Sequence, residues 1–149
     1  MGKWEKGKEK MDENMERDME CEMEVPREGI DELIYRVIGC MIEVHKQLGP
    51  GFLESVYRRA IAIEFQEQGI PFESEKKIEL RYKGNHIGIH LLDLFVENGL
   101  VIELKTVEVL HKKHYAQVRS YLKAVQKPVG LLVNFAEFQL NTRRVELIT

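Results

Sequence analysis

The sequence lacks several features that would place it in a specialised class of protein. It has two cysteines, Cys21 and Cys40, which cannot frame a disulfide scaffold and do not have the spacing of a zinc site. It has no uninterrupted apolar run of about 18 residues, the length of a membrane span. Its N-terminus has no apolar signal core. We therefore expect a cytoplasmic protein with no membrane partner.

A strong net charge is also missing. The formal charge is −3, so overall charge gives no support for nucleic-acid binding, and any such surface must be local. The 149 residues, of which 44% are apolar and 32% charged, suit one globular domain with a hydrophobic core. The chain is too short for a repeat array or a cofactor domain joined to a second catalytic domain.

Charge is unevenly placed along the chain. Residues 1–28 carry ten acids and six bases, a net charge of −4, and residues 29–149 carry a net charge of +1. We expect residues 1–28 to be a disordered or loosely helical acidic tail, and residues 29–149 to form the domain. Methionines recur at every fourth position of the tail and could form a helical stripe for a partner, although composition favours a solvated extension: Met11, Met15, Met19 and Met23.

Apolar spacing in the domain predicts an alternation of helices and strands. A three-and-four periodicity predicts helices over 30–48, 53–68 and 112–125. The first is stopped by Gly49, Pro50 and Gly51. Alternating or continuous apolar runs predict strands over 78–82, 87–96, 100–105, 129–133 and 144–148. The order indicates a single α/β domain with a mixed central sheet flanked by helices. The inward residues of the second helix should be Val56, Tyr57, Ala60, Ile61 and Phe65.

Charged residues inside two apolar strands are the main indication of chemistry. Glu103 and Lys105 share one face of the strand over 100–105, because strand side chains alternate between faces. Burying a carboxylate there is costly unless something pairs with it. A Glu103–Lys105 salt bridge would be sufficient, but Asp93 is a second acid in the neighbouring apolar strand.

The register of the hairpin between these strands decides whether the two acids meet. A two-residue Asn98-Gly99 turn would pair Asp93 with Leu104. A three-residue loop over 97–99, with Gly99 left-handed, would pair Val96 with Leu100 and Asp93 with Glu103. We predict the three-residue loop, which sets the side-chain roots of the two acids about 5 Å apart. Carboxylates so close must share a proton or hold a cation, and oxygen ligands suit Mg²⁺ or Mn²⁺.

Asp93 followed by Glu103-x-Lys105 resembles the metal site of the PD-(D/E)xK nuclease superfamily. Residues 51–57 read GxxExxY, the motif of one branch of that superfamily, and residues 43–51 also look like that branch. Gln117 and Tyr121 match the QxxxY pattern of exonuclease-like members, and residues 130–135 resemble the closing strand. The resemblance covers residues 30–148. It implies a restriction-endonuclease-like three-layer core.

The resemblance also implies roles for individual residues. Asp93, Glu103 and the backbone carbonyl of Leu104 would bind the metal. Lys105 would be the catalytic lysine, which orients water or stabilises phosphate charge. Glu54 would be a catalytic glutamate that reaches the metal directly or through water. Gln117 and Tyr121, on one helix face, would contact substrate or brace the site. The chain departs from the pattern where Leu92 replaces the proline before Asp93 and where Leu91 is apolar.

Other polar residues have simpler explanations. Basic residues along the third predicted helix, Arg119 and Lys123 among them, form either a solvated face or the positive surface that phosphodiesters require. Glu54 taken alone could be a first-turn helix acid. We interpret His45 as a half-buried surface histidine and Cys40 as a small core residue. His111 and His114 flank the start of the third predicted helix and could contact phosphate, although a solvated helix end is the simpler explanation.

These features favour a magnesium-dependent nuclease that hydrolyses phosphodiester bonds, with DNA preferred to RNA as the partner. Two alternatives stay open: a catalytically silent nucleic-acid-binding module, and a protein-interaction module whose acidic tail docks a basic partner. A homodimer is also open, since small nucleases often dimerise to cut two strands.

Overall fold

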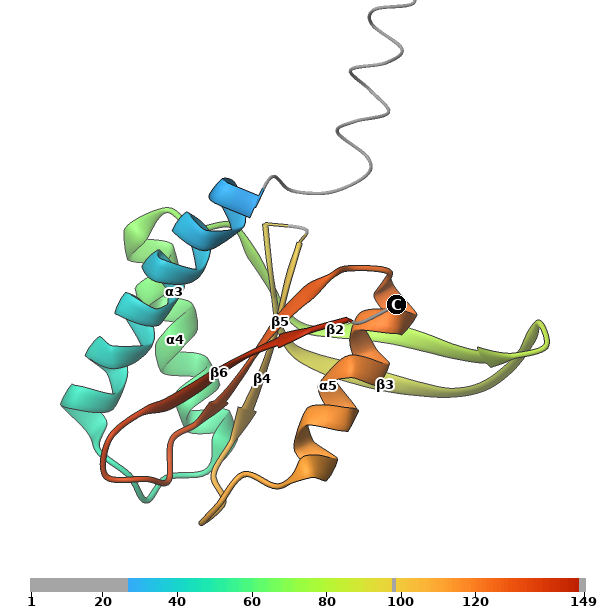
Figure 1. Cartoon of the computed structure of the whole chain (residues 1–149). Helices are drawn as coiled ribbons and strands as arrows, with labels where there is room; N and C mark the ends of the chain where they lie inside the picture. Colours follow the sequence, from blue (N-terminus) through green and yellow to red (C-terminus); the bar gives the residue numbers. More distant parts are fainter. Residues whose placement is uncertain (1–26, 98, 148–149) are drawn as a thin grey trace, which may run out of the picture.

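The computed structural model describes residues 27–97 and 99–147, which form three layers (Figure 1). The predicted tail and its methionine stripe lie outside these residues. In order, the elements are α3 (Arg27–Leu48), α4 (Glu54–Gln68), β2 (Phe72–Tyr82), β3 (Asn85–Val96), β4 (Leu100–Lys105), α5 (Lys112–Val125), β5 (Val129–Asn134) and β6 (Asn141–Glu146). The predicted order of helices and strands is confirmed.

The five strands form one mixed sheet in the order β2-β3-β4-β5-β6. Only β4 and β5 are parallel, and the other neighbours are antiparallel. The β4–β5 connection contains α5, which crosses one face of the sheet. Helices α3 and α4 cover the other face (Figure 1). The predicted α/β class, with helices on both sides of a mixed sheet, is therefore confirmed.

The hydrophobic core has two halves, one on each face of the sheet. Toward α3 and α4, the strands contribute the buried side chains Leu94, Val96, Leu100, Ile102, Leu104, Leu131 and Val133. Toward α5, they contribute Leu92, Phe95, Val101 and Leu132. Gly130 lets α5 lie close to the sheet, because a Cβ atom at this position would come within 3.1 Å of Val118 Cγ1 and of the Val101 carbonyl oxygen.

Three details of the secondary structure differ from the sequence predictions. The first strand begins at Phe72 instead of residue 78, and the last begins at Asn141 instead of residue 144. Both additions are polar segments held by pairing with a neighbouring strand, so apolar periodicity did not reveal them. Val56, predicted to face inward, is 37% exposed at the edge of the buried stripe of α4. No helix in the described part of the chain is long and apolar enough to cross a membrane.

Candidate active site

The site lies where β3 and β4 separate. Their ladder runs through Val96↔Leu100, Phe95↔Val101 and Leu94↔Ile102, which confirms the predicted pairing of Val96 with Leu100. The predicted left-handed conformation of Gly99 is not tested, because its φ angle includes an atom of Asn98, which lies outside the described residues. The ladder ends one position before Asp93 and Glu103, so the backbone N–H groups that follow it need other acceptors.

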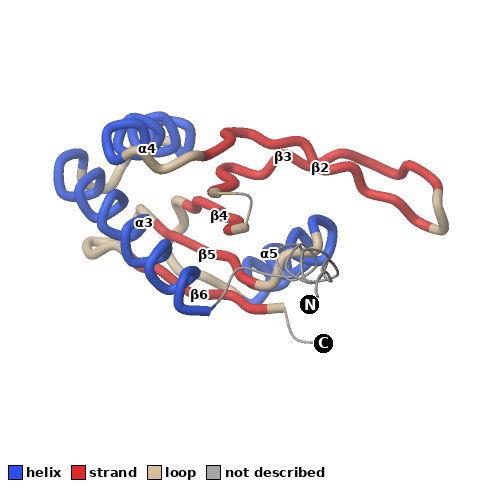
Figure 2. The backbone as a smooth tube through the Cα atoms, turned by 90° about the horizontal axis from the view of Figure 1, so that it is seen from above, coloured by secondary structure: helices blue, strands red, loops and turns tan. Residues whose placement is uncertain are grey.

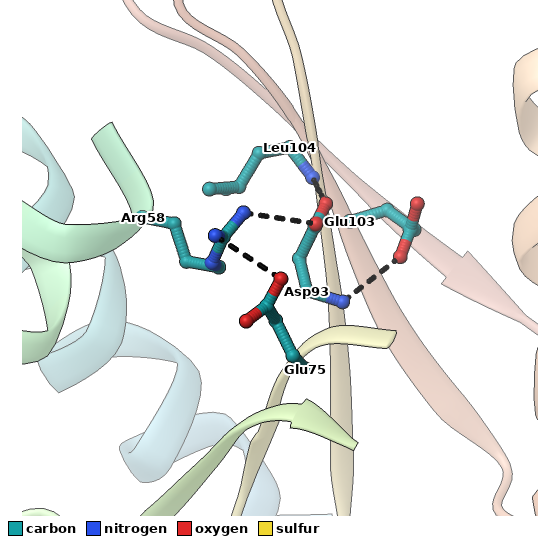
Figure 3. A network of polar contacts seen from close by, with 5 residues as sticks. All are labelled: Arg58, Glu75, Asp93, Glu103 and Leu104. Carbon is teal, nitrogen blue, oxygen red and sulfur yellow. Dashed lines mark hydrogen bonds and ion pairs between the residues drawn. The ribbon is translucent and has the colours of Figure 1, made fainter. Parts of the chain in front are cut away.

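The two acids supply those acceptors. The N–H of Asp93 donates to Glu103 Oε1 at 3.3 Å, and the N–H of Leu104 donates to Asp93 Oδ2 at 2.8 Å. Each carboxylate thus bonds to the backbone of the opposite strand, and together they bridge the separation. Figure 3 shows both bonds.

The carboxylates of the two acids point in different directions (Figure 3). Arg58 of α4 lies 4.0 Å from Asp93 Oδ1 and 3.3 Å from Glu75 Oε2, so Asp93 turns toward α4. Glu103 turns away from Arg58. The acids are neighbours, as the register predicts, but in this conformation their oxygens do not converge on one point.

Burial and mutual repulsion shape the electrostatics of this pair. Glu103 is only 5% exposed, and its burial, reinforced by the charge of Asp93, raises its pKa to about 8. Burial also raises the pKa of Asp93, although the N–H of Leu104 and the charge of Arg58 oppose this shift. Two buried acids that resist ionising together form an environment that a cation would stabilise.

Lys105 lies two residues beyond Glu103, at the end of β4, and is held there by α5. Its ammonium group donates to Gln117 Oε1 at 2.9 Å. Tyr121 lies one turn further along α5 and is 7% exposed. Burial and the charges of Glu103 and Asp93 raise the pKa of Tyr121 to about 12, so its hydroxyl stays neutral. The predicted pair Gln117 and Tyr121 therefore faces the two acids and Lys105.

Glu54 joins the cluster from the first turn of α4. Burial raises its pKa, the nearby charge of Asp93 raises it further, and the charge of Lys105 opposes both. The backbone of Thr106, just after β4, also lowers the pKa of Glu54. Glu54 therefore lies within electrostatic reach of both Asp93 and Lys105, as a second-helix glutamate of this site should.

The donor set fits magnesium, although the side chains are not gathered into a finished ligand shell. Among the described residues, no group of three or more His, Cys, Asp or Glu side chains is placed to hold a metal ion. Magnesium, however, is commonly held by only one or two carboxylates and completes its shell with water and phosphate oxygens. Asp93 and Glu103 match that requirement.

A model of the PD-(D/E)XK nuclease superfamily matches residues 31–145. The chain belongs to this superfamily. The match includes every residue placed in the cluster above. The superfamily model does not distinguish the GxxExxY branch, so assignment to that branch stays a prediction.

Two solved structures are similar to this chain. The crystal structure of SSO0001 is similar with a TM-score of 0.50 and 16% identity, over 64% of this chain and 50% of that one. An alkaline exonuclease, LHK-Exo from Laribacter hongkongensis, gives a TM-score of 0.47 and 14% identity, over 63% of this chain and 56% of that one. The chain thus spans about half the length of each. A comparison with curated proteins gives no match.

The geometry gives the GxxExxY residues of this superfamily member distinct structural roles. Gly51 has φ of 119°, which a residue with a side chain rarely adopts. Glu54 begins α4 and faces the site. Tyr57 is fully buried, stacks on Phe135 at 4.5 Å, and donates from its hydroxyl to the Gly49 carbonyl at 2.5 Å. The tyrosine anchors the turn that sets the direction of Glu54.

Sequence reasoning missed the placement of His90 and Arg58. The ring of His90 stacks on Tyr121 at 3.8 Å, and its buried Nε2 has no hydrogen-bond partner among the described residues. Burial lowers the pKa of His90 despite the nearby Asp93. His90 directly precedes Leu91, the apolar position at which the chain departs from the superfamily pattern. Arg58 follows Glu54 by four residues on one helix, a spacing that could have revealed it.

Of the other polar residues, His114 lines a pocket together with Lys105 and Gln117, and the rest lie apart from the site. Arg119 and Lys123 are exposed and lie two positions from Gln117 and Tyr121 respectively, about 200° around the helix. His45 Nε2 lies 3.1 Å from the Glu137 carbonyl oxygen. His111 and His114 form a capping box at the start of α5. Cys40 is buried in the core.

Proposed function

We propose that the chain is a magnesium- or manganese-dependent nuclease that hydrolyses phosphodiester bonds of DNA. The observation that carries the proposal is the crossed pair of hydrogen bonds between Asp93 and β4, with Lys105 held beside it by Gln117. This arrangement places two carboxylates and one ammonium group around a single break in the sheet.

Asp93, Glu103 and the Leu104 carbonyl would hold the metal, with Glu54 reaching it directly or through water. A bound divalent ion would screen phosphate charge and lower the pKa of water. The backbone hydrogen bonds to Asp93 and Glu103 position both carboxylates before any ligand arrives. Because the two carboxylates point in different directions, binding one ion would require them to turn toward a common point (Figure 3).

Lys105 supplies the positive charge that the reaction needs. In hydrolysis the oxygen of water bonds to phosphorus and gives up a proton to solvent, the ester P–O bond breaks, and the leaving oxygen gains a proton from solvent. An ammonium group has three N–H donors, and one of those of Lys105 bonds to Gln117. The others can stabilise charge developing on the phosphate oxygens or orient the attacking water. Gln117 and Tyr121 brace this geometry, and Arg119 and Lys123 contribute only general attraction for a polyanion.

Labelled single- and double-stranded DNA and RNA, incubated with Mg²⁺, Mn²⁺ or chelator, test the proposal. We expect metal-dependent cleavage that Glu103→Ala reduces at least about a hundredfold. Glu67→Ala is the matched control, because it removes an exposed acid from α4. The proposal fails if the wild-type chain cleaves none of the substrates with either metal, or if Glu103→Ala cleaves as well as Glu67→Ala.

A nucleic-acid-binding module without turnover is the second candidate. The contact between Arg58 and Asp93 favours it, since a cation already lies beside one of the two carboxylates. Binding of DNA without cleavage, retained in Lys105→Ala, would support this candidate against the nuclease.

A further inference from the structure

The outer parts of β2 and β3 form a two-stranded arm that extends from the body of the domain. We define the arm as residues 77–91. Strand β3 pairs with β4 only from Leu94 to Val96, but it pairs with β2 as far as Tyr82↔Asn85. The arm therefore has no third strand, and Figures 1 and 2 show it running well beyond the other strands.

One face of the arm carries an exposed apolar row on β3, beside the charged side chains of Lys77 and Glu79 on β2. Ile87, Ile89 and Leu91 alternate along β3 and are 64%, 57% and 44% exposed. On the other face, Ile78 is buried and Leu80 packs against the core half that includes α5. A two-stranded ribbon is marginally stable in water by itself, so an exposed apolar row on such a ribbon indicates a surface that meets a partner.

The charge of the arm selects the kind of partner. Residues 80–92 contain Arg81, Lys83, His86 and His90 but no Asp or Glu, in a chain of net charge −3. The acid nearest the tip, Glu79, is paired with Arg81 at 2.8 Å. A local cationic segment is complementary to a polyanion, and like charge opposes its pairing with the same segment of a second copy.

The shape of the arm narrows the choice to duplex DNA. Its tip is a two-residue turn in which Lys83 and Gly84 have φ of 51° and 80°, as in the tight type I′ turns of hairpins. The major groove of B-form DNA admits a two-stranded ribbon and presents thymine methyl groups to apolar side chains. The major groove of A-form RNA is too deep and narrow for side chains to read.

The arm leads directly into the site. Eight residues of β3 separate Asn85 at the tip from Asp93, a distance of about 26 Å at the usual rise of a strand. That length corresponds to roughly eight base pairs of duplex DNA. The arm would thus follow the groove beside a phosphate bound by the metal that Asp93 is proposed to hold.

We propose that the arm binds the major groove of duplex DNA next to the bond that the site attacks. The position of the arm next to the cleaved bond rests on the proposed nuclease function. Binding of the arm to the DNA groove does not require turnover. Arg81 and Lys83 would contact phosphates, and Ile87, Ile89 and Leu91 would contact base edges.

The test compares Arg81→Gln/Lys83→Gln with a control that removes the same charge elsewhere. The control is Lys46→Gln/Arg143→Gln, two exposed residues on α3 and β6. Affinity for a duplex DNA and a duplex RNA of equal length is measured by fluorescence anisotropy over a salt series in chelator. Hydrolysis of the small diester bis(p-nitrophenyl) phosphate is measured separately with Mg²⁺.

For the arm variant we expect DNA affinity to fall roughly tenfold or more and the slope of log K against log salt to shrink by about 1.8. Arg81→Lys/Lys83→Arg should restore both values, and diester hydrolysis should not change. Wild-type affinity for duplex RNA should be weaker than for DNA. Thermal unfolding should confirm that each variant folds.

Equal DNA binding by the arm variant and the control would overturn the proposal. A wild-type preference for duplex RNA over duplex DNA would also overturn it. So would an arm variant that keeps its DNA affinity but no longer sediments as a dimer, because the arm would then be a contact between two copies of the chain. If no substrate is cleaved but the arm variant still loses DNA affinity, the nuclease proposal fails and the arm proposal stands.

Discussion

The inner strands and the arm belong to one sheet but present their residues to different surroundings. All six residues of β5 are buried, as are the first five of β4, Glu103 included. The arm exposes most of its side chains, apolar ones among them. A charged side chain on the arm is solvated by water, whereas a charged side chain buried in β4 costs free energy unless it is paired. In our proposals the inner strands therefore carry the chemistry and the arm binds DNA.

Two lysine substitutions, one in β4 and one in the arm, should separate catalysis from DNA binding most clearly. We expect Lys105→Ala to lower the rate of metal-dependent DNA cleavage by about a hundredfold or more, since it removes a charge that stabilises the transition state. Lys83→Ala should instead weaken DNA binding and leave small-diester hydrolysis unchanged. Steady-state kinetics on both substrates check the pair, and equal loss of small-diester hydrolysis in the two variants would remove the distinction.

Truncating a residue of the inner sheet should give the next largest effect. Leu131 on β5 is 1% exposed and lies in the core half covered by α3 and α4. We expect Leu131→Ala to lower the free energy of unfolding by about 2–5 kcal/mol, through lost burial and the cavity left behind. Urea denaturation measures this change. A loss below about 1 kcal/mol would mean that this part of the core is not tightly packed.

The buried carboxylates should make stability depend on pH in the absence of metal. Burial and the charge of Asp93 raise the pKa of Glu103 to about 8, above the ordinary 4.5. The folded state therefore holds this proton more tightly than the unfolded state. The resulting stabilisation is complete below pH 4.5 and is lost as the pH rises toward 8.

In chelator, the melting temperature should accordingly fall across this range, and less steeply in Glu103→Gln. Glu67→Gln, which changes an exposed acid, should keep the wild-type slope. Mg²⁺ should raise the melting temperature more at the alkaline end, where it does not compete with protons. Identical slopes for Glu103→Gln and Glu67→Gln would contradict the electrostatic account of the pair.

Removing the brace of Lys105 should have a moderate effect. Gln117→Ala takes away the acceptor that lies 2.9 Å from Nζ, and we expect kcat to fall roughly tenfold with little change in KM. Gln117→Glu, which keeps an acceptor oxygen, should recover part of the loss. Arg119→Ala changes a residue on the far side of the same helix and should mainly weaken substrate binding. A change in KM alone for Gln117→Ala would argue for substrate contact instead of positioning.

The smallest effect on stability should come from the arm. Ile89 is 57% exposed, so Ile89→Ala should change the free energy of unfolding by no more than about 0.5 kcal/mol. Urea denaturation beside Leu131→Ala gives the contrast. A loss comparable to that of Leu131→Ala would show that the apolar row of the arm is covered in solution.

The sequence predicted the parts of the fold that depend on local patterns. The helix predicted over 112–125 coincides with α5, because its apolar spacing is regular and Pro128 follows it. The β3–β4 register was also predictable, since loop length alone decides which residues pair. The start of β6 was not, because Asn141, Thr142 and Arg143 carry no apolar signal and are held by pairing with β5.

Two features of the site and arm illustrate the limit of local patterns. The sequence placed Asp93 beside Glu103 but could not show that Arg58 turns one carboxylate away from the other. The alternation of Ile87, Ile89 and Leu91 predicted a strand, yet not that this apolar row would be left exposed.

Periodicity and turn length determined the elements, their order and the pairing of the two acidic strands, because these depend on residues close in the chain. Only the tertiary structure decided that α5 brings Gln117 to Lys105, that α4 brings Arg58 to Asp93, and that β2 and β3 extend beyond the body. Those outcomes depend on how distant segments pack across the two faces of the sheet, and the spacing along one segment carries no information about what covers it.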